Sequence, residues 1–183
     1  MRIEKTKMVE FNYKKDETFC KIIALVLPLE AGFANHPNDP GGPTMRGVAW
    51  NYNAQYLREK FGFETWHDIK YLTKDQACQC YYDRYWLASG ADGITDVDLA
   101  FIHLDAAINC GVGSAQKFLS RLSKNPKHFD GRGGKNRTLF LGLFLEYTAN
   151  RLSYYTSCKN RDDFLEGWVN RMVKVIRESK DLD

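Results

Sequence analysis

Apolar residues recur at helical spacing along most of the chain, beginning with residues 16–30. The residues that predict this first helix are Phe19, Ile22, Ile23 and Val26. Asp16 can cap its start, and Pro28, which has no backbone N–H, weakens its last turn. We therefore expect the helix to end near Glu30 and Gly32 to take the left-handed turn that follows.

The same spacing predicts further helices after residue 47. They are expected at 48–60, 75–87, 97–110, 114–122, 137–157 and 163–179. Gly62 is expected to stop the helix at 48–60, and Thr73 with Gln76 to cap the start of the helix at 75–87. Thr95 or Asp96 should cap the helix at 97–110, and Asp163 with Glu166 the helix at 163–179.

Residues 33–47 break the helical pattern. The segment HPNDPGGP places three prolines and two glycines in eight positions, which predicts a stiff loop. No other segment shows sustained strand alternation. The predicted fold class is therefore mainly α, with at most a small hairpin near residues 33–48.

One seam divides the chain, at the sequence GVG in residues 111–113. We expect a tail at 1–15, a first part at 16–110 and a helical second part at 111–183. The second part is expected to pack on the first as one compact unit.

Composition narrows the function classes. The chain has 183 residues, is 44% hydrophobic and has a formal net charge of +3. Basic and acidic residues are interspersed, which argues against a nucleic-acid partner. The longest apolar run, residues 22–29, is far short of the roughly 18 residues of a membrane span, so no stable membrane insertion is expected. Residues 1–19 lack a signal-peptide core, which indicates synthesis in the cytoplasm without a signal peptide.

The cysteines and histidines are dispersed. Five cysteines at scattered spacings favour reduced thiols, with a metal site or a single bridge as the alternative. The histidines His36, His67, His103 and His128 do not cluster in sequence, so neither a metal site nor a cofactor is expected.

Two carboxyl groups stand out because their surroundings differ. Glu30 closes an apolar helix, where burial and the helix C-terminus both raise the pKa of a carboxyl group. Asp39 lies in a polar loop, where it would stay ionised. Glycoside cleavage uses such a pair: Glu30 would donate a proton, while Asp39, with Thr44, would support the developing charge or the attacking water. The alternative is structural, because both residue types are common at helix ends and turns.

The stretch LEAGFANHPNDPGGPTMRGV, residues 29–48, resembles the signature of glycoside hydrolase family 108. These are N-acetylmuramidases related to phage endolysins and once called secretion-activating proteins. The signature runs E-G-G-Y/F-x-N and then N-D-P-G-G-x-T-x-x-G, and this chain departs from it at Ala31. Later segments also resemble the family, ending with a helical module described as a predicted peptidoglycan-binding domain. These segments are 81–92, 99–121, 129–139 and 164–172.

The resemblance implies a lysozyme-like fold with a helical C-terminal extension, and it implies that Glu30 is catalytic. The order of Glu30, Asp39 and Thr44 also resembles the E-x8-D-x5-T arrangement of phage-type lysozymes, one residue short at the threonine. Asp39 has the alternative role of bracing its loop. Asn35, which matches the signature, is a candidate for substrate binding.

Four further residues are candidates for substrate binding. Tyr85 and Trp86 could stack on a sugar face, or they could be core aromatics. Asp105 and Asn109 lie on one helix face and could bind sugar, or they could fasten the helix to Arg46. We expect Trp168 and Arg171 to fasten the C-terminal helix.

The resulting hypothesis is a monomeric peptidoglycan hydrolase of the lysozyme type. It would cleave the β-1,4 bond between N-acetylmuramic acid and N-acetylglucosamine in glycan strands, without a cofactor. A prophage endolysin released through a holin, or a wall enzyme exported by non-classical secretion, would fit this activity. The alternative from another class is a non-catalytic peptidoglycan-binding or secretion-accessory protein on the same fold.

Overall fold

The structure, a computed structural model, describes residues 12–30, 32–37, 39–123 and 137–179. Most of the expected tail, Ala31, Asn38, the segment 124–136 with His128, and residues 180–183 lie outside the described residues. The elements in chain order are η1 (Tyr13–Lys15), α1 (Glu17–Val26), η2 (Leu27–Leu29), β1 (Thr44–Met45), β2 (Val48–Ala49), α2 (Trp50–Phe61), η3 (Trp66–Tyr71), α3 (Lys74–Tyr81), the π-helical turn η4 (Tyr82–Trp86), α4 (Leu87–Ser89), η5 (Ala91–Gly93), α5 (Val97–Cys110), α6 (Val112–Ser123), α7 (Arg137–Ser157) and α8 (Arg161–Glu178).

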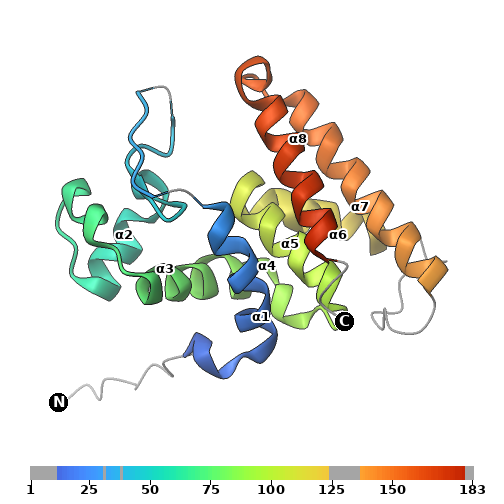
Figure 1. Cartoon of the computed structure of the whole chain (residues 1–183), viewed down its shortest axis with the longest axis horizontal. Coiled ribbons are helices and arrows are strands. Elements are labelled where there is room, and N and C mark those ends of the chain that lie inside the picture. The colour runs from blue at the N-terminus through green and yellow to red at the C-terminus, as the bar shows by residue number, and fades with distance from the viewer. Residues whose placement is uncertain (1–11, 31, 38, 124–136, 180–183) are drawn as a thin grey trace, which may run out of the picture.

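The fold is mainly α with one small hairpin, as the sequence predicts. In Figure 1 the hairpin, α2 and α3 lie on one side of α1, and α5 to α8 lie on the other. Helices α7 and α8 pack against each other, and α8 also contacts α5. Among the described residues, no helix combines the length and the hydropathy of a membrane-spanning segment.

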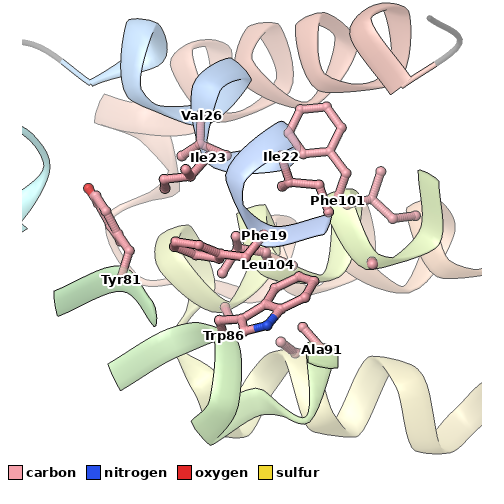
Figure 2. Close-up of a cluster of buried hydrophobic side chains, with 14 of the residues drawn as sticks. Phe19, Ile22, Ile23, Val26, Tyr81, Trp86, Ala91, Phe101 and Leu104 are labelled. Atoms are coloured by element: carbon pink, nitrogen blue, oxygen red, sulfur yellow. The ribbon is translucent and has the colours of Figure 1, made fainter. Parts of the chain in front are cut away.

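Helix α1 is held at its start and along its apolar face. The Asp16 side chain accepts a hydrogen bond from the Phe19 backbone N–H at 2.9 Å, which confirms the predicted cap. The predicted apolar residues of α1 are buried and pack against residues of η4 and α5 (Figure 2). This packing fixes the end of α1, and with it the position of Glu30.

The hairpin is built by a two-residue turn. Arg46 has φ 51° and Gly47 has φ 74°, between the paired residues Met45 and Val48. Two positive φ values match a type I′ turn, which suits the twist of a tight hairpin. Arg46 is the non-glycine residue with positive φ among those described, and its carbonyl oxygen accepts a hydrogen bond from the Tyr81 hydroxyl at 2.8 Å.

Helix α5 is the centre of the molecule. Its residues from Leu99 to Ala107 are all buried, including the polar His103 and Asp105. A helix buried on every face must be covered on every side. Here α1, η4, α6 and α8 pack against it, and Tyr147 and Arg151 of α7 bind its polar side chains.

The turn predicted at Gly32 depends on Ala31, which lies outside the described residues; Glu30 itself leaves the helix, with φ −94° and ψ 122°. One local prediction was wrong. Helix α8 begins at Arg161, so Asp163 lies inside the first turn and does not cap it with Glu166. Acids at Asp162 and Asp163 still suit the positive end of the helix dipole.

Candidate active site

Glu30 lies where the first helix tightens and ends. Because Pro28 lacks an N–H, the chain closes with the 3-10 turn η2, and the Glu30 N–H donates to the Leu27 carbonyl oxygen at 3.1 Å. The Glu30 side chain is 11% exposed. The helix end thus holds this carboxyl group at a partly covered position.

The surroundings of Glu30 are not the apolar ones that the sequence suggested. Nη2 of Arg171, on α8, lies 2.6 Å from Oε1 of Glu30. The same guanidinium donates through Nε to Oδ1 of Asp105 at 2.8 Å. Arg171 therefore bridges two acids from different helices, and it pairs with a residue 141 positions earlier.

The ion pairs continue through the core to Asn109. Nη2 of Arg151 lies 2.6 Å from Oδ2 of Asp105, and its Nε donates to the Tyr155 hydroxyl at 2.7 Å. That hydroxyl donates to Oδ1 of Asn109 at 2.6 Å. Burial alone would raise the pKa of Asp105, but the guanidinium groups of Arg171 and Arg151 outweigh it and hold that pKa below its usual value. Asp105 is thus an anion that pairs with both arginines.

The hairpin turn lies close to Oε2 of Glu30, the carboxyl oxygen that Arg171 does not bind. A methyl group at Gly47 would collide with Oε2 of Glu30 and with the Tyr81 hydroxyl. Glycine is therefore required twice at this position, for the positive φ and for the close approach. Arg171 and Gly47 together restrict where the carboxyl group can lie.

Asp39 and Thr44 occupy the loop before the hairpin. Oδ1 of Asp39 accepts the Gly41 N–H at 2.8 Å, which is the loop-bracing contact considered as its alternative role. Thr44 donates its hydroxyl to the Gly42 carbonyl oxygen at 2.9 Å and starts β1. Asn35 is exposed in the same loop. The loop is thus held largely by its own hydrogen bonds.

A cavity of about 610 Å³ separates this loop from the C-terminal helices. On one wall lie Asp39, Pro40, Tyr52, Arg84 and Tyr85; residues 108–112 form its middle. The wall that α7, α8 and the turn between them contribute consists of Tyr154, Tyr155, Cys158, Asn160, Phe164 and Trp168. The Trp168 ring stacks on Tyr155 at 5.2 Å and on Phe164 at 5.9 Å between centroids. Such aromatic walls suit the C–H faces of sugar rings.

Of the predicted site residues, Asp39, Tyr85 and Asn109 line the cavity. Glu30 is not among its lining residues, but it adjoins the same wall, because Trp168 lies one helical turn before Arg171, which binds Glu30. Tyr85, which lines the cavity, packs with its ring centroid 5.6 Å from that of Tyr81, and the Tyr81 hydroxyl lies with the Glu30 carboxyl group beside Gly47. The acid therefore lies beside the cavity.

Two predicted substrate contacts need correction. Trp86 is 1% exposed, and its Nε1 donates to Oδ2 of Asp16 at 2.9 Å, so it is a core residue and cannot stack on a sugar (Figure 2). Asp105 is 0% exposed and acts on the site through the two arginines that it binds, Arg171 and Arg151. It does not hold α5 to Arg46, whose Nε instead donates to the Leu72 carbonyl oxygen at 3.2 Å.

Sequence reasoning missed most of the C-terminal wall. Trp168 and Arg171 were expected mainly to fasten a helix, and Arg151, Tyr154, Tyr155 and Phe164 gave no local signal. A buried arginine needs an acidic partner, but the sequence does not show which one. In the described part of the chain, no three histidine, cysteine or acidic side chains gather as metal ligands would, and the five cysteines are free thiols.

Residues 23–111 match the family model of Glycosyl hydrolase 108. The matched region contains Glu30, the hairpin, Tyr85, Asp105 and Asn109, and it ends before α6. This match supports a glycoside hydrolase assignment for that part of the chain. Arg151 and Arg171, which complete the buried ion-pair network, lie outside it.

A solved structure of SagA from Brucella abortus has the same fold. It superposes with a TM-score of 0.71 at 24% sequence identity, over 91% of this chain and 95% of that one. The likeness extends through the C-terminal helices and agrees with a mainly helical, lysozyme-like fold. Among curated proteins, no sequence matches this chain.

Proposed function

We propose that the protein is a peptidoglycan hydrolase of the N-acetylmuramidase type. The observation that carries this proposal is the position of Glu30 at the end of α1, inside the matched family region and beside an aromatic-walled cavity. The glycan strand lies in the cavity, with sugar faces against Tyr85 and Trp168. The scissile bond is the β-1,4 bond between N-acetylmuramic acid and N-acetylglucosamine.

Glu30 acts as the general acid. In its carboxylic acid form it donates its proton to the bridging oxygen as the bond breaks and the sugar ring becomes oxocarbenium-like. Asp39, which lines the cavity, supports the positive charge or places the attacking water, and Thr44 holds the loop that carries it. Arg171 positions Glu30 and, after proton transfer, stabilises the carboxylate that remains.

The protein works as a monomer on the cell wall and needs no cofactor. Holin-type release or non-classical secretion would bring it there, in phage lysis or in wall remodelling. The non-catalytic alternative has one specific observation in its favour: the Arg171 guanidinium already holds Oε1 of Glu30 at 2.6 Å, so the proposed proton donor is engaged by a side chain of the protein itself.

The test is digestion of purified peptidoglycan by the wild type and by Glu30→Gln, with mass spectrometry of the released fragments. The wild type should release fragments with N-acetylmuramic acid at the reducing end. The variant, shown by circular dichroism to be folded, should lose at least about a hundredfold in rate. If neither protein releases fragments and both sediment with insoluble wall, the non-catalytic alternative replaces the proposal.

A further inference from the structure

A second cavity, on the outer face of α2, adjoins the cavity beside Glu30. This second cavity has a volume of about 500 Å³ and is lined by α2 residues and by Arg84. Among the described residues, Tyr52 and Arg84 line both cavities. The two cavities therefore meet at these two side chains, and a ligand longer than the first cavity would have to pass them to enter the second.

Arg84 gives the junction a cationic side chain with open donors. Its Nη2 donates to the Tyr52 carbonyl oxygen at 3.2 Å, which fixes the side chain at the junction. A guanidinium has five N–H donors, and the residue is exposed, so the remaining donors can face a ligand. The Tyr52 side chain beside it is 58% exposed.

The acids near this junction already have partners. Oε1 of Glu59, in the second cavity, accepts a hydrogen bond from Gln55 at 2.9 Å. Asp83 accepts from Tyr56 at 2.6 Å and from Gln79 at 2.9 Å. Arg58 adds a second cation to the lining of this cavity. The chemistry that fits is an extended anionic chain with carboxylates, because guanidinium binds carboxylate through paired N–H donors.

We infer that Arg84 and the second cavity bind the peptide stem carried by the muramic acid residue in the first cavity. This inference rests on the proposed function and names the part of the substrate that the second cavity recognises. The stem leaves the glycan from the lactyl group of muramic acid, and it carries several carboxylates that glycan without peptide lacks. Arg84 is then a specificity residue that acts on binding of the peptide.

The experiment compares intact peptidoglycan with the same material after an amidase has removed the stem peptides. Wild type, Arg84→Gln and Arg121→Gln are assayed for kcat/KM on both substrates. Arg121 is the matched control: it is also exposed on a helix, donates a side-chain hydrogen bond to Asn150 at 3.1 Å, and is not among the lining residues of either cavity. Sedimentation of Glu30→Gln, with and without Arg84→Gln, measures binding to both walls independently of catalysis.

The wild type and Arg121→Gln should prefer the peptide-bearing wall by about tenfold, and Arg84→Gln should reduce this preference to about threefold or less, mainly through KM. The sedimented fraction should follow the same order. Equal use of both walls by the wild type, or an unchanged preference in Arg84→Gln, overturns the inference while leaving the muramidase proposal in place. An equal loss on both walls in Arg84→Gln also overturns it, since Arg84 would then serve the glycan. If no variant digests either wall and the sedimented fraction is the same with and without peptide, both the muramidase proposal and the inference about Arg84 are overturned.

Discussion

Gly47 sets how closely the hairpin can approach Glu30, so the site depends on a residue that has no side chain. Gly47→Ala should destabilise the fold by roughly 1–3 kcal/mol through the strained positive φ, and it should lower kcat by at least about tenfold because the methyl group displaces Glu30 and Tyr81. Denaturant unfolding and wall digestion measure the two effects. Gly62→Ala is the control: Gly62 has nearly the same φ, 72°, but open space around its Cα. If the two variants lose activity equally, the close approach at Gly47 does not matter.

A second prediction at the scale of single residues concerns Arg171, which positions Glu30. A lysine is a point charge and cannot hold Glu30 and Asp105 through separate N–H groups. Arg171→Lys should therefore lower kcat more than it raises KM, and Arg171→Ala should destabilise the protein by about 3–5 kcal/mol, because it leaves buried acids short of a partner. Arg177→Lys, at an exposed position on the same helix, should change neither quantity. Wild-type kinetics in Arg171→Lys would exclude a role for the two-pronged contact.

Sequence predicts single residues well where the signal is local. Glu30 and the glycine-rich loop follow from a contiguous motif, and the caps at Asp16 and Thr73 follow from neighbours three positions away. The partner of Glu30 cannot be predicted in this way, because 141 residues separate Glu30 from Arg171 and only the tertiary fold brings them together. The burial of Trp86 could not be predicted either, because an aromatic residue on a helix can stack on a sugar or pack in the core, and the sequence does not distinguish the two roles.

At the scale of elements, one side chain joins two of them. Oδ1 of Asp16 caps α1, while Oδ2 accepts the indole N–H of Trp86 from η4. Asp16→Ala should lower the free energy of unfolding by roughly 2–3 kcal/mol, the sum of a lost cap and an unpaired buried N–H. Asp16→Asn can keep the cap but presents an amide donor to Trp86, so about half of that loss is expected. Urea unfolding of both variants decides; wild-type stability in Asp16→Asn would mean that the Trp86 bond contributes nothing.

The helices themselves were largely predictable, and the exceptions have physical causes. The stop at Gly62 and the bounds of α7 agree with the pattern, because amphipathic spacing and glycine stops are local. The π-helical turn at Tyr82–Trp86 was not predicted, since periodicity does not reveal an inserted residue. This turn carries both Tyr85, at the cavity, and Trp86, in the core, so the missed feature decides which aromatic faces the ligand.

At the scale of the whole molecule, the buried polar groups of α5 make stability depend on pH. Burial lowers the pKa of His103, although the Ser89 carbonyl oxygen opposes the shift, and the pKa of Asp105 also lies below its usual value. In the unfolded chain, histidine binds a proton near pH 6.5 and aspartate near pH 3.9. The unfolded state therefore takes up protons that the folded state does not, and the free energy of unfolding falls as the pH falls. We expect one decline from about pH 7 downwards, due to His103, and a second below about pH 4, due to Asp105, each with a slope of at most about 1.4 kcal/mol per pH unit.

The variant His103→Gln separates the two declines. It loses the ring contacts to Tyr147 at 2.9 Å and Ser89 at 3.2 Å, so it should be less stable than the wild type at pH 7.5. Between pH 7 and 5, however, its stability should change less, because the group that takes up the proton on unfolding is gone. Urea unfolding at intervals of one pH unit measures both quantities, with His67→Gln, at an exposed position, as the control. A slope in His103→Gln as steep as that of the wild type would place the pH dependence elsewhere, and the buried core of α5 would not be its source.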